Sequence, residues 1–395
     1  MRLIHIRFIL IPAVLLMVLH TPAPAQTPDS PVQLTSSLKA SGQLGLSLRQ
    51  EASASMKRGL DWLAALQRPD GSWSDTNFPA LTALAIWPFI QSDYPGKEDR
   101  INRAVSFLRS FVQPDGGIYR PVPNRKGGGL SNYNTAICMT VLHATGRKDL
   151  VEVIQKARTF IAGNQHFGDD EYRGGFGYDR QTQRAYTDLL NTYYSAEAMR
   201  VTQDVEDLRP AGDAKVDINW AETVKYIERL QNKPAAGTNE AGGFVYNPAD
   251  PKAGTVTNQQ GVVVFRSYGS ITYAGLLALI YAQVNRDDVR IRSALDWAGR
   301  HWSLDENPGM GQDGLFFFFN VLSKALNAAG QDFIPRPSGE PVDWRADLTR
   351  KLIALQKIEP ETGAGYWIND INRYWEGDKV LVTAYTLRAL QMVVP

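Results

Sequence analysis

RGLDWLAALQRPDGSW, residues 58–73, joins a helical pattern to a tight turn and a tryptophan. Leu60, Leu63 and Leu66 lie three residues apart, which places them on one face of a helix. The Pro-Asp-Gly sequence that follows favours a turn and ends the helix. The stretch therefore predicts an amphipathic helix that is closed by a short loop.

The same order of residues returns along the chain. Further copies are RAVSFLRSFVQPDGGIY (103–119), KARTFIAGNQ to GGFGY (156–178), VKYIERLQ to GGFVY (224–246) and KLIALQ to GAGYW (351–367). A sixth, degenerate copy runs from SALDWAGRHW to GMGQDGLFFFF (293–319) and lacks the glutamine of the others. The recurring glutamines are Gln67, Gln113, Gln165, Gln231 and Gln356. This repetition predicts six copies of one structural unit.

A second, more apolar stretch follows the loop of every copy. These stretches are residues 80–90, 134–145, 189–201, 271–282, 315–329 and 381–394. Each is typical of a helix that is buried on most sides, as expected when outer helices face water and inner helices face a common axis. We therefore predict an all-α fold, an (α/α)6 toroid in which six helical hairpins close into a double ring. It forms one domain over residues 51–395.

The repeated loop has a structural interpretation. Gly71 permits the reversal of the backbone, and Trp73 can cover the end of the hairpin. The amide of Gln67 is placed to satisfy helix-end groups of an adjacent unit. These roles hold the ring together and involve no catalysis.

The residues resemble a known superfamily. The 58–73 stretch resembles a QW repeat of the squalene-hopene cyclases, and the wider pattern over residues 55–395 resembles the prenyltransferase and squalene-oxidase repeat superfamily. The stretch from Arg266 to Leu322 is especially similar to exported bacterial squalene-cyclase-like proteins. The resemblance implies a terpenoid cyclase-like α/α toroid. It does not by itself imply the activity, because function depends on the site.

Two chemistries of that superfamily lack their motifs here. Squalene-type cyclases protonate an alkene with a D-x-D-D motif, which this sequence does not contain; its Asp169-Asp170 and Asp287-Asp288 pairs fall in predicted loops. Protein prenyltransferases hold zinc with Asp, Cys and His. Cys138 and His143 are five residues apart on a predicted helix and do not share a face, so we expect a buried structural thiol, no metal site and no cofactor.

The N-terminus has the pattern of a secretion signal. Arg2 and Arg7 precede an apolar run, residues 8–19, and the small residues up to Ala25 suit signal peptidase. We expect residues 1–25 to be a signal peptide cleaved after Ala25, residues 26–50 to form a flexible segment, and the protein to be exported, to the periplasm or the medium. The run is too short to span a bilayer, and no later segment is long and apolar enough to do so.

The charge balance is nearly neutral. Lys and Arg number 42, and Asp and Glu number 41. Nothing in this balance favours a nucleic acid or an anionic membrane surface as a partner. We expect a small apolar or isoprenoid-like ligand instead, and the sequence leaves the oligomeric state open.

The candidate site is placed by the geometry of a hairpin ring. The N-terminal ends of the inner helices should surround the mouth of a cavity, with unpaired N–H groups that favour acceptors and anions. The polar residues at these ends are Asn132, Tyr133, Asn134, Asp188, Asn191, Tyr194, Tyr268, Tyr273, Asp313, Asp378 and Tyr385. Helix capping is the alternative role for any one of the Asp and Asn residues. If there is acid chemistry, Asp188 or Asp378 is the predicted donor, and Tyr133 and Tyr268 would position the substrate or stabilise positive charge.

Three functions stay open at this point. The first is an exported toroid that binds an apolar molecule of isoprenoid type in a central cavity, with terpenoid cyclase-like activity if it is an enzyme. The run Phe316 to Phe319 could contribute to that cavity, although at least half of four consecutive helical positions must belong to the core. The second is a secreted polysaccharide lyase or glycosidase on the same fold. The third is a binding scaffold without catalysis.

Overall fold

The structure of the protein is a computed structural model that describes residues 44–122, 130–179, 186–234, 239–337 and 339–394. The predicted signal peptide and most of the predicted flexible segment lie outside these residues. The first described helix, α2, begins at Leu46, five residues before the domain boundary predicted at residue 51.

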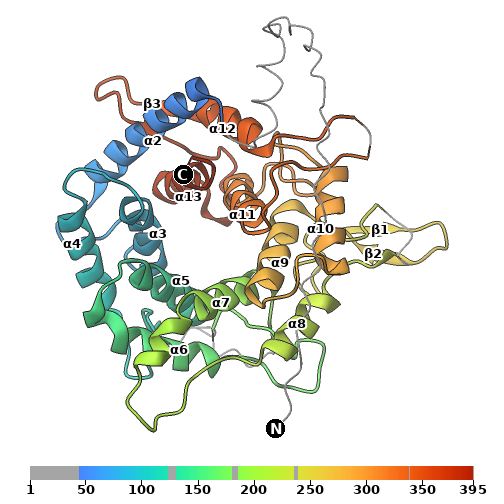
Figure 1. Cartoon of the computed structure of the whole chain (residues 1–395), viewed down its shortest axis with the longest axis horizontal. Helices are drawn as coiled ribbons and strands as arrows, with labels where there is room; N and C mark the ends of the chain where they lie inside the picture. Colours follow the sequence, from blue (N-terminus) through green and yellow to red (C-terminus); the bar gives the residue numbers. More distant parts are fainter. Residues whose placement is uncertain (1–43, 123–129, 180–185, 235–238, 338, 395) are drawn as a thin grey trace, which may run out of the picture. The chain divides into compact units, whose positions relative to one another are not determined.

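Twelve α-helices occupy the described part of the chain, and they alternate between an outer and an inner ring (Figure 1). The outer helices are α2 (Leu46–Leu66), α4 (Lys97–Arg109), α6 (Val151–Ala162), α8 (Trp220–Arg229), α10 (Val289–Arg300) and α12 (Trp344–Leu355). The inner helices are α3 (Pro79–Ile90), α5 (Ser131–Ala144), α7 (Leu189–Val201), α9 (Gly269–Tyr281), α11 (Leu315–Ala328) and α13 (Lys379–Val393). The short 3-10 helices are η2 (Lys148–Leu150), η3 (Gln203–Leu208) and η5 (Arg373–Trp375).

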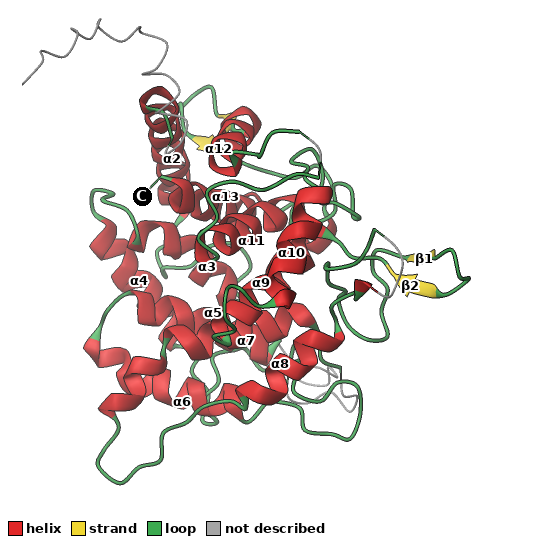
Figure 2. Cartoon of the chain, turned by 45° about the vertical axis from the view of Figure 1, so that its right-hand side comes forward, coloured by secondary structure: helices red, strands yellow, loops and turns green. Residues whose placement is uncertain are grey.

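Each inner helix packs against the next, and α13 returns to α3, so the inner ring is closed. The predicted (α/α)6 toroid is therefore confirmed. Extended structure in the described residues is limited to two antiparallel pairs, β1 (Thr255–Thr257) with β2 (Val263–Phe265) and β3 (Lys357–Ile358) with β4 (Gly365–Tyr366). Figure 2 shows the first pair projecting from the helices as a hairpin. No described helix is long and apolar enough to cross a membrane.

The two rings differ in how their helices are buried. In the inner helix α9, the first eleven residues are all buried, because neighbours cover every side. In the outer helix α10, burial follows a stripe that includes Ile291, Ala294 and Ala298, and the other face meets water. The sequence patterns of the two helices in each hairpin reflect this difference.

Four of the five recurring glutamines tie one outer helix to the next. Gln67 Nε2 donates to the carbonyl of Arg100 in α4 at 3.0 Å, so its amide bonds to the adjacent unit as predicted, although to a carbonyl within the helix and not at its end. The corresponding contacts of the other three are Gln165 with the carbonyl of Asn219, Gln231 with that of Arg290, and Gln356 with that of Ser55. Gln113 instead bonds within its own unit, to the carbonyls of Phe111 and Tyr119.

The loops of the repeats depend on glycine and tryptophan. Gly71 has φ +88°, and a Cβ there would lie 2.3 Å from the carbonyl oxygen of Arg103 in the next outer helix. Gly242 repeats this arrangement, with φ +90° and 2.1 Å to the carbonyl oxygen of Ser293. Trp73 is fully buried, and its Nε1 donates to the carbonyl of Leu63 at 2.8 Å. Both predicted roles are confirmed: glycine turns the backbone, and tryptophan seals the hairpin.

Candidate functional site

A cavity of about 350 Å³ lies where the N-terminal ends of the inner helices meet. Every inner helix contributes a wall residue from its first two turns. These are Leu81 of α3, Tyr133 of α5, Leu190 and Tyr194 of α7, Ser270 and Ile271 of α9, Phe317 of α11, and Leu381 and Tyr385 of α13. Loops that precede these helices add Phe78, Tyr178, Tyr246, Lys252, Tyr268, Asn307, Met310, Asp313, Tyr374 and Trp375. The volume falls in the range of small-molecule sites.

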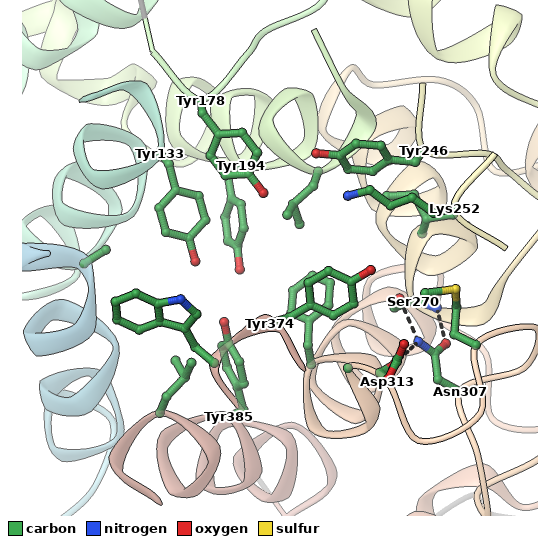
Figure 3. Close-up of a pocket in the computed structure, with 18 of the residues that line it drawn as sticks. Tyr133, Tyr178, Tyr194, Tyr246, Lys252, Ser270, Asn307, Asp313, Tyr374 and Tyr385 are labelled. Carbon is green, nitrogen blue, oxygen red and sulfur yellow. Dashed lines mark hydrogen bonds between the residues drawn. The ribbon is translucent and has the colours of Figure 1, made fainter. Parts of the chain in front are cut away.

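Tyrosine dominates the wall. Seven tyrosines line the cavity in the described part of the chain: Tyr133, Tyr178, Tyr194, Tyr246, Tyr268, Tyr374 and Tyr385. All but Tyr268 are labelled in Figure 3, which shows them around the hollow, and phenylalanine and aliphatic side chains also line it. Such a wall presents ring faces and a few hydroxyl groups, which suits a mostly apolar ligand that carries few polar atoms.

Three of these tyrosines meet at one side of the cavity. The hydroxyl groups of Tyr133, Tyr194 and Tyr385 point toward one another (Figure 3). Burial raises the pKa of Tyr133, while hydrogen bonding with Tyr385 and Tyr194 opposes the rise. Tyr194 also packs edge-on against Tyr133, with ring centroids 5.3 Å apart, and Tyr385 packs on Phe317 at 5.8 Å. We call these four residues the aromatic floor.

Two charged side chains line the cavity among the described residues, Lys252 and Asp313. Arg373 donates to Asp313 at 2.9 Å and compensates its charge. Lys252 has no such partner: its ammonium lies 3.2 Å from the ring centroid of Tyr246 and 5.6 Å from that of Tyr374. The pKa of Lys252 is lowered, chiefly because burial disfavours the charged form.

Carboxylates cap three inner helices at this end of the ring. Asp188 accepts from the N–H of Asn191 in α7, and Asp378 from the N–H groups of Val380 and Leu381 in α13. Glu376 accepts from the first turn of α11, at 3.2 Å from the N–H of Phe316 and 2.7 Å from that of Phe317.

Neutral acceptors cap the other three inner helices. Asn134 Oδ1 accepts from Ala80 of α3, Asn307 Oδ1 from Ser270 of α9, and the Tyr178 carbonyl from Asn132 and Tyr133 of α5. The N–H groups that were predicted to point unpaired at the mouth are therefore partly satisfied by the protein itself. Protein acceptors hold N–H groups of every inner helix, because a helix end buried without partners is costly.

The structure brings five of the eleven predicted site residues to the cavity wall. These are Tyr133, Tyr194, Tyr268, Asp313 and Tyr385. Of the others, Asn134 and Asp378 cap helices and Asn191 bonds to Asp188. Asn132 ties the Gly177 carbonyl and Ser195 to α5, and Tyr273 packs on Phe318 with ring centroids 5.9 Å apart. These six side chains hold the wall in place from behind it.

The two predicted acid donors differ in their surroundings. Asp188 is fully buried, and both of its oxygens accept from Asn191 at 2.8 Å. Burial raises the pKa of Asp188 to about 6, against the opposing effects of Asn191, Lys252 and Tyr246. Asp378 is half-buried and also accepts from the hydroxyl of Ser74. Neither carboxyl lines the cavity, so a proton from Asp188 would have to pass the residues in front of it.

Sequence reasoning missed several wall residues, and the repeat itself marks two of them. In five units a threonine near the start of the inner helix bonds to the backbone N–H of a buried loop residue. Thr192 does so with Phe176, and Thr272 with Phe244. Tyr178 and Tyr246 each lie two residues after these loop residues, so they occupy the same position in their two repeat units. Lys252, Tyr374 and Trp375 come from insertions and carry no such mark.

Phe317 lines the cavity, whereas Phe316, Phe318 and Phe319 are buried in the core, which confirms the prediction for this run. Cys138 is fully buried, and burial raises the pKa of its thiol far above the usual value. Within the described ranges, no three His, Cys, Asp or Glu side chains are arranged to hold a metal ion.

A second buried polar cluster fills the ring toward the C-terminal ends of the inner helices. Lys324 of α11 donates to Glu197 at 2.5 Å and to the Tyr193 hydroxyl at 2.6 Å, and the Tyr281 hydroxyl also donates to Glu197. Arg388 of α13 lies close by. Burial opposes the ionisation of Glu197, but Lys324 and Arg388 outweigh it and lower its pKa. We call these five residues the ionic plug.

The sequence matches no protein-family model and no curated protein. Solved structures with the same fold include a variant of the type II terpene cyclase MstE from Scytonema in complex with its substrate, geranylgeranyl dihydroxybenzoate. It is 14% identical with a TM-score of 0.52, over 89% of this chain and 99% of that one.

Two sugar-active proteins are as similar. A variant of the α-1,6-mannanase GH76A of Salegentibacter sp. HEL1_6, in complex with α-1,6-mannotriose, is 9% identical with a TM-score of 0.51, over 87% of this chain and 99% of that one. A D-mannose isomerase is 12% identical with a TM-score of 0.53, over 87% and 96%. At these identities the likeness establishes the α/α toroid and leaves the function to the site.

Proposed function

We propose that this protein binds an apolar molecule of isoprenoid type in the cavity at the N-terminal ends of its inner helices. The observation that carries the proposal is the cavity wall, which seven tyrosines dominate and to which all six inner helices contribute. Aromatic faces give an apolar chain a large contact area. The tyrosine hydroxyl groups can form hydrogen bonds with the few polar atoms that such a ligand carries. A terpene cyclase of the same fold binds a prenylated substrate, which supports this choice.

The charged groups at the cavity favour the binding of an isoprenoid over glycosidase activity. Glycosidases of the common type place two carboxyl groups on opposite sides of the bond that they break. Among the described wall residues Asp313 is the only carboxylate, and Arg373 holds it. Asp188, Asp378 and Glu376 are engaged at helix ends. The mannanase and the mannose isomerase therefore support the fold alone.

The proposed role is binding, with no catalytic step assigned. A cyclase that protonates an alkene needs an acid in contact with its substrate. The buried carboxyls with raised pKa values, Asp188 and Glu376, both stand behind the wall. Export to the periplasm or the medium belongs to the same proposal and rests on the N-terminal sequence pattern.

The proposal is tested by mass spectrometry of small molecules that co-purify with the protein and by titration with farnesol, a C15 prenyl alcohol. Leu190→Trp fills the cavity from the first turn of α7 and should abolish both signals. Leu66→Trp, the same substitution at an exposed position of the outer ring, is the matched control and should keep both. A retained glycan, or farnesol binding that Leu190→Trp leaves unchanged, would overturn the proposal.

A further inference from the structure

The charge at one end of the ligand can be inferred from Lys252, the positively charged side chain of the cavity wall. Lys252 follows Tyr246 on the loop that leads to β1, and Figure 3 shows its ammonium directed into the hollow beside the Tyr246 ring. No carboxylate of the described residues lies within ion-pair distance of it, and none of its N–H groups donates to a described acceptor. The cation rests instead on the faces of Tyr246 and Tyr374.

The charged groups around Lys252 are otherwise committed. Asp188 acts on it from behind Tyr246, but both Asp188 oxygens accept from Asn191 and serve the N-terminus of α7. Asp250 acts on it only at longer range. Arg373, the second cation nearby, is paired with Asp313. The ammonium of Lys252 is therefore the charge at the cavity that has no direct partner among the described residues.

An unpartnered ammonium in a mostly apolar wall is costly to keep. Lys252 is half-buried, and the part of its hydration that the wall removes without supplying acceptors destabilises the fold. An anion that enters the cavity can supply these acceptors through charge-assisted hydrogen bonds, which are stronger than neutral ones. These bonds add to the affinity for an anionic ligand.

We propose that Lys252 binds the anionic end, a carboxylate or a phosphate, of the apolar ligand, so that the site takes amphipathic acids in preference to neutral alcohols. This inference rests on the proposed function. Three residues of the aromatic floor, Tyr133, Tyr194 and Tyr385, lie across the cavity from Lys252 (Figure 3). The apolar chain therefore extends from Lys252 toward Tyr133 and Tyr385.

The test compares three ligands with the same C15 chain, farnesoic acid, farnesyl phosphate and farnesol, by equilibrium titration at pH 8. We expect the wild-type protein to bind the two anionic ligands about tenfold more tightly than farnesol, as one hydrogen bond to a charged group provides. Lys252→Met should remove this preference, because it removes the charge that the anionic ligands contact. Lys252→Arg keeps the charge and should retain the preference, and Lys156→Met, on the outer face of α6, should behave as wild type.

The outcomes separate the two proposals. If no ligand of the three binds, the proposed function fails and the inference with it. If farnesol binds and the anionic ligands bind no better, the ligand class of the cavity stands and the role of Lys252 is overturned. A preference for anions that persists in Lys252→Met would assign the anionic end to another residue and overturn the inference as well. If only one of the two anionic ligands gains affinity, and loses it in Lys252→Met, that ligand identifies the end group.

Discussion

Gln356 bonds to Ser55, 301 residues before it, through both ends of its amide. Its Nε2 donates to the Ser55 carbonyl at 2.9 Å, and its Oε1 accepts from the Ser55 hydroxyl at 2.9 Å. Arg58 also donates to the same oxygen, at 2.8 and 3.0 Å. These bonds attach the end of the last outer helix, α12, to the first, α2. The recurring glutamine of the repeat, which joins neighbouring units along the chain, thus also joins the last outer helix to the first.

Gln356→Ala should therefore destabilise the whole ring. The substitution leaves the Ser55 carbonyl and the Arg58 donors without their partner, so we expect the free energy of unfolding to fall by about 1–3 kcal/mol. Urea denaturation followed by circular dichroism measures the change. Gln113→Ala is the matched control, because the side chain of Gln113 bonds to the carbonyls of Phe111 and Tyr119 within its own unit, and it should cost less. Equal losses in the two variants would show that ring closure adds nothing.

The ionic plug predicts a strong coupling between Glu197 and Lys324. Glu197→Gln removes the carboxylate and leaves two buried cations, Lys324 and Arg388, without a countercharge. We expect a loss of about 3–5 kcal/mol in the free energy of unfolding. Lys324→Met in the Glu197→Gln background should recover part of it, because one uncompensated charge is gone. Losses that simply add in a double-mutant cycle would contradict the buried ion pair.

The sequence predicts the ring better than it predicts the site, for physical reasons. The repeat predicts the fold, because each of the six units must pack against its neighbours in the same way. Gln67 and Gly71 are residues of the repeat that meet this requirement. The wall of the cavity combines residues at repeat positions, such as Tyr194 and Tyr385, with residues from loops of unequal length, such as Lys252. The spacing of the sequence repeat does not predict which residues of the loops reach the cavity.

The helix ends show a second limit. Asp and Asn at the start of an inner helix satisfy its N–H groups, and a residue that caps a helix has its side chain turned along the backbone. Asp378 and Asn134 are examples, and neither lines the cavity. The tyrosines at these ends cannot cap in this way, because their rings are long, and four of the five predicted do reach the wall. Glu376, which caps α11 from a distant loop, has no local signal at all.

Export is predicted to remove residues 1–25. Expression in a secreting bacterial host should give a mature protein that begins at Gln26, because small residues precede that position and an apolar run lies upstream. N-terminal sequencing of the protein outside the cytoplasm measures this. Ala25→Phe should block the cleavage by removing the small residue next to the bond. Recovery of Met1 on the exported wild-type protein would contradict the prediction.

Asp188→Asn and Asp378→Asn should distinguish a helix-capping role of these two residues from a role in the ligand site. In Asp188→Asn a donor replaces one acceptor of Asn191, so we expect a loss of about 1–3 kcal/mol in stability. Asp378→Asn should cost less, because asparagine caps helices about as well as aspartate. Farnesol affinity should stay unchanged in both variants, since neither carboxyl lines the cavity. Thermal melting confirms folding before titration, and a tenfold loss of affinity in a folded variant would return that residue to the site.

Glu376 predicts how stability responds to pH. Burial raises its pKa to about 7 from an ordinary value of 4.5, although Asn369 and the N–H groups of α11 favour its charged form. Between these two values the folded protein holds a proton that the unfolded chain has released. The contribution of Glu376 to stability is therefore greatest below pH 4.5 and declines as the pH rises toward 7, by about 3 kcal/mol for a shift of this size.

Glu376→Gln cannot titrate, so it should remove this decline. Urea denaturation at intervals from pH 4 to pH 8 gives the free energy of unfolding of both proteins. The difference between variant and wild type should grow in favour of the variant as the pH rises through the window, and it should be constant above it. Glu98→Gln, at an exposed position in the first turn of α4, is the control and should run parallel to wild type. A Glu376→Gln curve that also runs parallel would mean that the folded protein releases the Glu376 proton as readily as the unfolded chain does.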